Sequence, residues 1–237
     1  MRDDPTGVAA RVAAVRERIA AACRRAGRPV EEVTLVAAAK AQPVERLVAA
    51  VGAGVRVLGE NRVQEAEAHR AALAGAGVAE ALAWHLIGPL QSNKARAAAD
   101  LFDLVHSVDR EKIARALDRE LATRDRRIEA LVEVNVGGEA TKHGFDPEGL
   151  ADRLRPLADL AHLRIAGVMV IPPPGDSAEE SRPWFRRARA LRDELAARPE
   201  WSGFPGHLSM GMSDDFEVAV EEGATHVRIG SVLFGPR

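Results

Sequence analysis

Apolar and polar positions alternate along this chain in two repeating patterns. Short runs rich in β-branched residues are followed by longer runs in which apolar residues recur every three or four positions. The first pattern is typical of buried strands and the second of amphipathic helices. Eight strands are predicted, at residues 33–40, 55–61, 83–90, 101–108, 128–136, 163–171, 206–211 and 225–231.

A further helix is predicted ahead of the first strand, over residues 8–27, where Gly27 ends it. Its apolar positions share one face: Val8, Val12, Val15 and Ile19. Helical patterns separate the strands, and one of them is expected to start with Ser213 as its cap and to run to Glu222. Eight strand–helix units behind an extra helix predict an α/β fold, a (β/α)8 TIM barrel. A doubly wound open sheet is the structural alternative.

Length and composition narrow the class of protein. The 237 residues suit one barrel, so we expect a single domain over residues 1–237. A net charge of −2 gives no basic excess for nucleic acid, and no apolar run reaches membrane-spanning length. The single cysteine, Cys23, permits no internal disulfide, and the charged start of the chain lacks the apolar region of a signal peptide. We therefore expect a cytoplasmic protein.

Lys40 is the first candidate for chemistry, because it ends the apolar run VTLVAAA. In a barrel the active face lies at the carboxyl ends of the strands, and a lysine there can present an amine for a Schiff base. The alternative is a lysine whose stem lies on apolar surface while its ammonium reaches solvent. Position alone does not decide between the two.

The segments SMGMS (209–213) and RIGS (228–231) predict an anion site. Hydroxyls and backbone N–H groups at a helix start bind anions, and the loops after strands seven and eight often hold phosphate in this fold. A plain helix cap would explain either segment alone, but both fall at the same place in the barrel. Arg228 lies on the opposite face of strand eight from its two apolar neighbours and needs an acceptor there, either a ligand atom or a structural carboxylate.

Other polar residues near strand ends carry weaker signals. His85 fits a core histidine better than a base, and Asn135 and Lys142 suit either the site or its loop. The seven histidines have no metal-ligand spacing, and no nucleophile elbow, P-loop or dinucleotide fingerprint is present.

Taken together, the motifs resemble the YggS/PROSC family, the pyridoxal phosphate homeostasis proteins. The matching segments occur in family order over nearly the whole chain: AAAK ending at Lys40, LGENRVQE (58–65), WHLIGPLQSNK (84–94), LVEVNV with TKHG (141–144), IAGVMVI, HLSMGMSDDFEVAV (207–220) and HVRIGSVLFGPR (226–237).

The resemblance implies a pyridoxal phosphate (PLP) protein of fold type III, like the barrel domain of alanine racemase, with the cofactor's aldehyde on Lys40. It implies that Asn61 lies beside the cofactor ring and that Arg228 approaches the pyridine nitrogen. It implies that Ser209, Gly230 and Ser231 bind the phosphate and that Met210 is a further cofactor-binding residue. Gln42 stands where the family often has a second lysine. At position 231 the family often has threonine, and Ser231 keeps its hydroxyl group.

The function implied is a PLP carrier in intracellular PLP homeostasis rather than an enzyme. An arginine at the ring nitrogen weakens the cofactor as an electron sink. The chain contains no tyrosine to act as the racemase's second base. We expect a monomer that hands PLP to apo-enzymes and has neither nucleic-acid nor membrane partners. The alternatives are a racemase-like enzyme, with His85 or another mouth residue as second base, and an aldolase-like barrel that uses Lys40 on a sugar phosphate.

Overall fold

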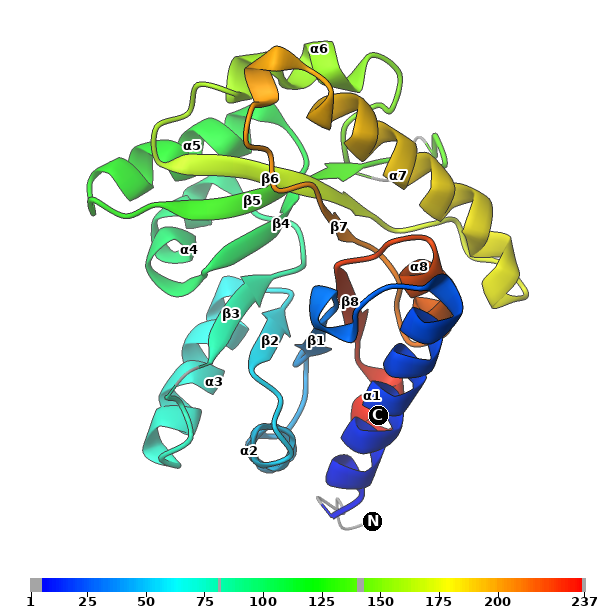
Figure 1. Cartoon of the computed structure of the whole chain (residues 1–237). Coiled ribbons are helices and arrows are strands. Elements are labelled where there is room, and N and C mark those ends of the chain that lie inside the picture. Colours follow the sequence, from blue (N-terminus) through cyan, green and yellow to red (C-terminus); the bar gives the residue numbers. More distant parts are fainter. Residues whose placement is uncertain (1–5, 81, 140–142, 236–237) are drawn as a thin grey trace.

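All eight strands form one closed, parallel barrel. A computed structural model describes residues 6–80, 82–139 and 143–235, and β8 pairs back onto β1 (Figure 1). The strands are β1 (Thr34–Ala38), β2 (Val57–Glu60), β3 (Ala83–Leu86), β4 (Leu104–Val108), β5 (Ile128–Val134), β6 (Leu163–Val170), β7 (His207–Ser209) and β8 (His226–Ile229). The predicted barrel is confirmed, and the open-sheet alternative is wrong because every strand is paired on both sides.

Helices alternate with these strands and surround the barrel. They are α1 (Thr6–Ala26), α2 (Val44–Gly52), α3 (Val63–Gly75), α4 (Ala95–Leu101), α5 (Glu111–Ala122), α6 (Leu150–Leu154), α7 (Arg182–Ala196), α8 (Phe216–Glu221) and α9 (Ser231–Phe234). The last helix has only four residues, and α1 packs against α2, α8 and α9. The extra helix α1 therefore covers the part of the barrel that the short helix α9, which follows β8, leaves open. None of the described helices combines the length and apolarity that a membrane span requires.

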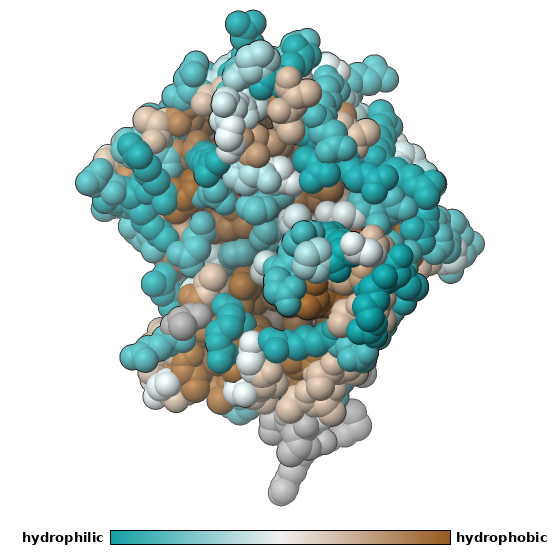
Figure 2. Space-filling model, viewed as in Figure 1, coloured by the Kyte–Doolittle hydropathy of each residue, from teal (hydrophilic) through white to brown (hydrophobic). Residues whose placement is uncertain are grey.

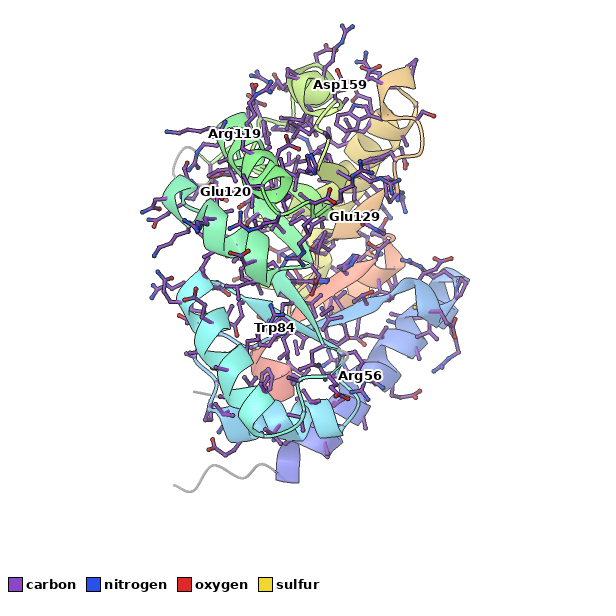
Figure 3. The ribbon with its side chains drawn as sticks, turned by 90° about the vertical axis from the view of Figure 1, so that its left-hand side faces the viewer. Arg56, Trp84, Arg119, Glu120, Glu129 and Asp159 are labelled. Carbon is purple, nitrogen blue, oxygen red and sulfur yellow. The ribbon has the colours of Figure 1, made fainter. Side chains whose placement is uncertain are left out.

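The main apolar core lies between the sheet and the helices. It includes the predicted inner face of α1, whose residues Val8, Val12, Val15 and Ile19 are at most 3% exposed. Trp84 of β3, labelled in Figure 3, belongs to the same layer. A separate apolar cluster consists of Leu104, Leu131, Ala166 and Met169, from three neighbouring strands. Leu104 shares a face of β4 with His106, so apolar and polar side chains meet on that face.

On the outside of the barrel, ion pairs join α7 to the C-terminal end of α8. Arg182, Arg186 and Arg189 contact the buried Glu222 at 2.9, 3.1 and 3.3 Å. The side of the molecule formed by α7 is correspondingly hydrophilic (Figure 2). Three cations around one buried carboxylate satisfy a group that would otherwise be costly to bury.

The observed elements differ from the predicted ones mainly at their ends. Every strand is shorter than predicted, so Lys40 and Asn61 fall just after β1 and β2, and Ser231 opens α9. The expected helix from Ser213 to Glu222 is wrong at its start, because α8 begins at Phe216. The carboxylate of Asp215 accepts a hydrogen bond from the N–H of Met212 at 2.7 Å. That bond stabilises a turn where the apolar pattern alone predicts helix.

Candidate functional site

A cavity of about 500 Å³ opens at the carboxyl ends of the strands. Its lining brings together residues from segments that are far apart in the sequence: Lys40, Asn61, Ser213, Arg228, Gly230 and Ser231. Five of these are predicted site residues, and Ser213 is the addition. The volume lies in the range of small-molecule and cofactor pockets.

Lys40 reaches the cavity from a turn that directly follows β1. Ala39 donates its N–H to the carbonyl of Gly59 at 2.8 Å, and Gln42 donates its N–H back to Ala39 at 3.0 Å. Between them Ala41 has a φ of 55°, in the left-handed region that residues with a side chain rarely adopt. This geometry sends the side chain of Lys40, which is half-buried, to the cavity wall.

Another part of the cavity lining is rich in hydroxyls. Ser213 comes from the loop after β7, and Gly230 and Ser231 follow β8. The hydroxyl oxygen of Ser213 accepts a hydrogen bond from the N–H of Val232 at 3.4 Å, which joins the two loops. Serine hydroxyls retain a proton to donate, so this part of the lining suits an anion.

The Ser213 loop needs a glycine at Gly211. This residue has a φ of 89°, and a Cβ added to it would lie 2.5 Å from the Cβ of Ala219. The close approach packs the loop directly onto α8. A larger residue would push the loop, and Ser213 with it, away from its position.

Arg228 forms the cationic part of the lining. It is 5% exposed, and it donates to the hydroxyl of Ser209 at 2.6 Å and to the carbonyl of Val170 at 3.0 Å. Burial lowers the pKa of Arg228 to about 10, against the opposing charges of Asp215 and Glu133. The guanidinium therefore stays charged at neutral pH, with two of its five N–H groups held by these bonds.

Ser209 and Met210, both predicted site residues, do not line this cavity. Each is fully buried. The hydroxyl of Ser209 lies between Arg228 and Nδ1 of His106, which is 2.7 Å away. Strand alternation explains the difference, since the side chain of Ser209 at the end of β7 turns into the barrel toward Arg228, whereas Ser213 reaches the cavity from the following loop.

The polar chain continues inward from Ser209 through two histidines. Nε2 of His106 lies 3.0 Å from Nδ1 of His85. Burial lowers the pKa of His85 to about 3 and that of His106 well below its usual value, so both rings are neutral. The structural role favoured for His85 fits this position, and the ring is not part of the cavity lining.

The remaining sequence candidates lie elsewhere. Asn135 bonds both the N–H and the carbonyl of Glu139, which gives it a loop role. Lys142 falls outside the described residues. Within the described part of the chain, no three histidine, cysteine or acidic side chains are arranged to hold a metal.

A second, larger cleft of about 790 Å³ adjoins the cavity and shares Ile171, Met212, Ser213 and Asp214 with it. Ile171 and Met212 are 38% and 39% exposed, unusual for apolar side chains of this size. The mouth of the cavity therefore has an apolar rim on its cleft side. In the sequence, these two residues are indistinguishable from ordinary core positions.

The family model for the alanine racemase N-terminal domain matches residues 11–237. The chain belongs to this family. It is 44% identical over 227 residues to the pyridoxal phosphate homeostasis protein of Aquifex aeolicus, covering 96% of this chain and 97% of that protein. The resemblance predicted from the motifs is thereby confirmed.

Solved structures support the same grouping. PipY of Synechococcus elongatus PCC7942, solved with PLP bound, is 39% identical, with a TM-score of 0.79 over 93% of this chain and all of that one. An alanine racemase of Clostridium difficile superposes with a TM-score of 0.67 over 94% of this chain and 59% of that one. Its identity of 15% makes that likeness one of fold alone.

Proposed function

We propose that this protein binds PLP through an imine between Nζ of Lys40 and the cofactor's aldehyde, and that it acts as a PLP carrier in intracellular PLP homeostasis. The observation that best supports this proposal is that an amine, a buried guanidinium and two hydroxyls line one cavity. Membership in a family whose relatives are named for PLP homeostasis supports the proposal.

The lining fits the cofactor group by group. Lys40 supplies the amine, Ser213 and Ser231 supply hydroxyls for the phosphate, and Gly230 allows the backbone to approach it. Ser213 takes the role first assigned to Ser209, because the hydroxyl of Ser209 is already bonded to Arg228 and His106. Asn61, which also lines the cavity, is proposed to lie beside the pyridine ring of the cofactor.

Arg228 is proposed to face the ring nitrogen. The bound cofactor supplies an aldehyde that condenses with amines and, when its ring nitrogen is protonated, an electron sink. A guanidinium that remains charged disfavours that protonation. The arrangement thus suits holding PLP better than using it.

Racemisation would need a second base, and neither a tyrosine nor His85 supplies one in this cavity. The sequence contains no tyrosine, and the neutral ring of His85 is bonded to His106 away from the cavity. We therefore propose that the protein has no significant racemase activity. We further propose that it acts in the cytoplasm as a monomer and that apo-enzymes receive the cofactor from it at the open cleft side.

The test is PLP titration followed by borohydride reduction and mass mapping. We expect a visible absorption band and one pyridoxyl group on Lys40. Lys40→Ala should abolish both, whereas the matched control Lys112→Ala, an exposed residue of α5, should keep them. Retention of the band in Lys40→Ala would exclude the assignment. Rapid solvent-deuterium exchange at the α-carbon of alanine would instead favour the racemase-like alternative.

A further inference from the structure

A buried acid–base pair lies on the outer side of the barrel wall, behind the turn that carries Lys40. Glu60, the last residue of β2, is completely buried, and its Oε1 lies 2.6 Å from Nδ1 of His69 on α3. Nε2 of the same ring lies 3.1 Å from the carbonyl oxygen of Gln42. One imidazole therefore connects the barrel wall to the turn at Lys40.

Strand alternation explains why the carboxylate points outward. A Cβ on Gly59 would lie 2.8 Å from the side chain of Val36 and 3.0 Å from that of Ile87, so position 59 faces the barrel interior. Glu60, the next residue, faces the surrounding helices instead. There α3 packs against β2 (Figure 1), and the hydrogen bond between His69 and Glu60 joins the two elements.

The chemistry of the acceptor fixes one proton on this ring. A backbone carbonyl only accepts, so Nε2 of His69 must carry a proton and donate it to Gln42. The proton between Nδ1 and Oε1 can reside on either atom without breaking the bond. Burial raises the pKa of Glu60, partly offset by its hydrogen bond to His69, and Oε2 has no hydrogen-bond partner among the described residues. The imidazole is thus the hydrogen-bond partner of Oε1.

The hydrogen bond from His69 to Gln42 holds a turn whose backbone conformation is unfavourable for its residues. Ala41, with its left-handed φ of 55°, lies between Lys40 and Gln42, and both of these neighbours line the cavity. Gln42 is itself only 7% exposed. Strained turns persist where surrounding contacts hold them.

We propose that His69, oriented by Glu60, is a positioning residue that holds the Lys40–Gln42 turn in the conformation that presents the lysine amine to the cavity. The ring does not touch the bound ligand. Its contribution is to order the turn before binding, so that PLP does not have to. This role rests on the proposed PLP-binding function, but the ordering of the turn is a property of the free protein.

Two substitutions separate the two bonds of the ring. His69→Gln can place an N–H near the position of Nε2 and so keep the donor to Gln42, whereas His69→Asn can place an amide near Nδ1 and keep only the contact with Glu60. Glu67→Gln, at an exposed position of the same helix, is the control. Thermal unfolding identifies any variant that is broadly destabilised.

The decisive readout is hydrogen exchange of the peptide spanning residues 39–47 in the protein without cofactor. We expect about fivefold faster exchange at the N–H of Gln42 in His69→Asn, the factor given by one lost hydrogen bond, and near-normal exchange in His69→Gln. PLP affinity should fall by the same factor in His69→Asn only. Equal behaviour of the two variants, or unchanged exchange in both, would overturn the inference. Failure of the unmodified protein to bind PLP would contradict the proposed function, but the hydrogen-exchange result would still test the role of His69 in ordering the turn.

Discussion

Histidines inside the barrel should make the protein less stable as the pH falls below 6.5. His85 has a folded pKa of about 3 because it is buried, and its ordinary value is 6.5. Between these values the unfolded chain binds a proton at this site and the folded protein does not. Unfolding therefore becomes more favourable as pH falls, and stability present above pH 6.5 is progressively lost.

The magnitude follows from the shift. Between pH 7 and pH 5 the unfolded state gains most of one proton at His85, which lowers the free energy of unfolding by about 2 kcal/mol. His106 and His226, whose pKa values burial likewise lowers well below normal, act in the same direction. Burial raises the pKa of Glu60 and of Glu133, which acts in the opposite direction.

The assay is urea denaturation at pH 7 and pH 5, on the unmodified chain and on His85→Asn. An asparagine amide offers both an acceptor and a donor near Nδ1, so the contact with His106 is kept and only the titration is removed. Subtracting the two pH dependences cancels the contributions of the other groups. We expect the variant to lose about 2 kcal/mol less than the unmodified chain on acidification. The control Gln64→Asn changes an exposed, uncharged side chain of α3 and should leave the pH dependence as it was. A pH dependence that His85→Asn does not alter would refute the reasoning.

Two further predictions concern the loop after β7. Ser213→Ala should weaken PLP binding about fivefold through one lost hydrogen bond to the ligand, measured by spectroscopic titration. Unchanged affinity would exclude Ser213 from the phosphate site. Gly211→Ala should lower the free energy of unfolding by about 2 kcal/mol or more in urea denaturation, because its Cβ would meet Ala219 at 2.5 Å and its φ is 89°. An alanine tolerated there without loss would show that the loop can move away from α8.

The fold could be predicted because its signals are local. Each strand of a parallel barrel is buried on both faces and therefore forms a short apolar run, and each helix has its own periodic stripe. The element ends could not be predicted as well, since a single side-chain bond, such as that from Met212 to Asp215, decides where α8 begins.

The site was predictable only where a residue's position in its strand decides its direction. Lys40 and Arg228 line the cavity as their strand positions predict, and Asn61, which the family resemblance places at the site, lines it too. Ser209 and Ser213 belong to one short motif, and nothing in its residue types says which hydroxyl faces the barrel interior. The pairing of Glu60 with His69 depends on how α3 lies over β2, which no pattern in either segment specifies.

Two hydrogen-bonded systems meet the cavity from opposite sides of the barrel wall. On the outside, Glu60 and His69 hold the turn of Lys40. On the inside, Ser209 holds Arg228 and is itself bonded to His106. Without a ligand, His69 already contacts the Lys40 turn and two hydrogen bonds already hold Arg228, so part of the ordering cost of the amine and the guanidinium is met by folding. Such preorganisation raises affinity without adding contacts to the ligand, and it leaves the cleft side of the cavity open. A carrier needs this combination, because a ligand held by few direct contacts on an open side can also be released.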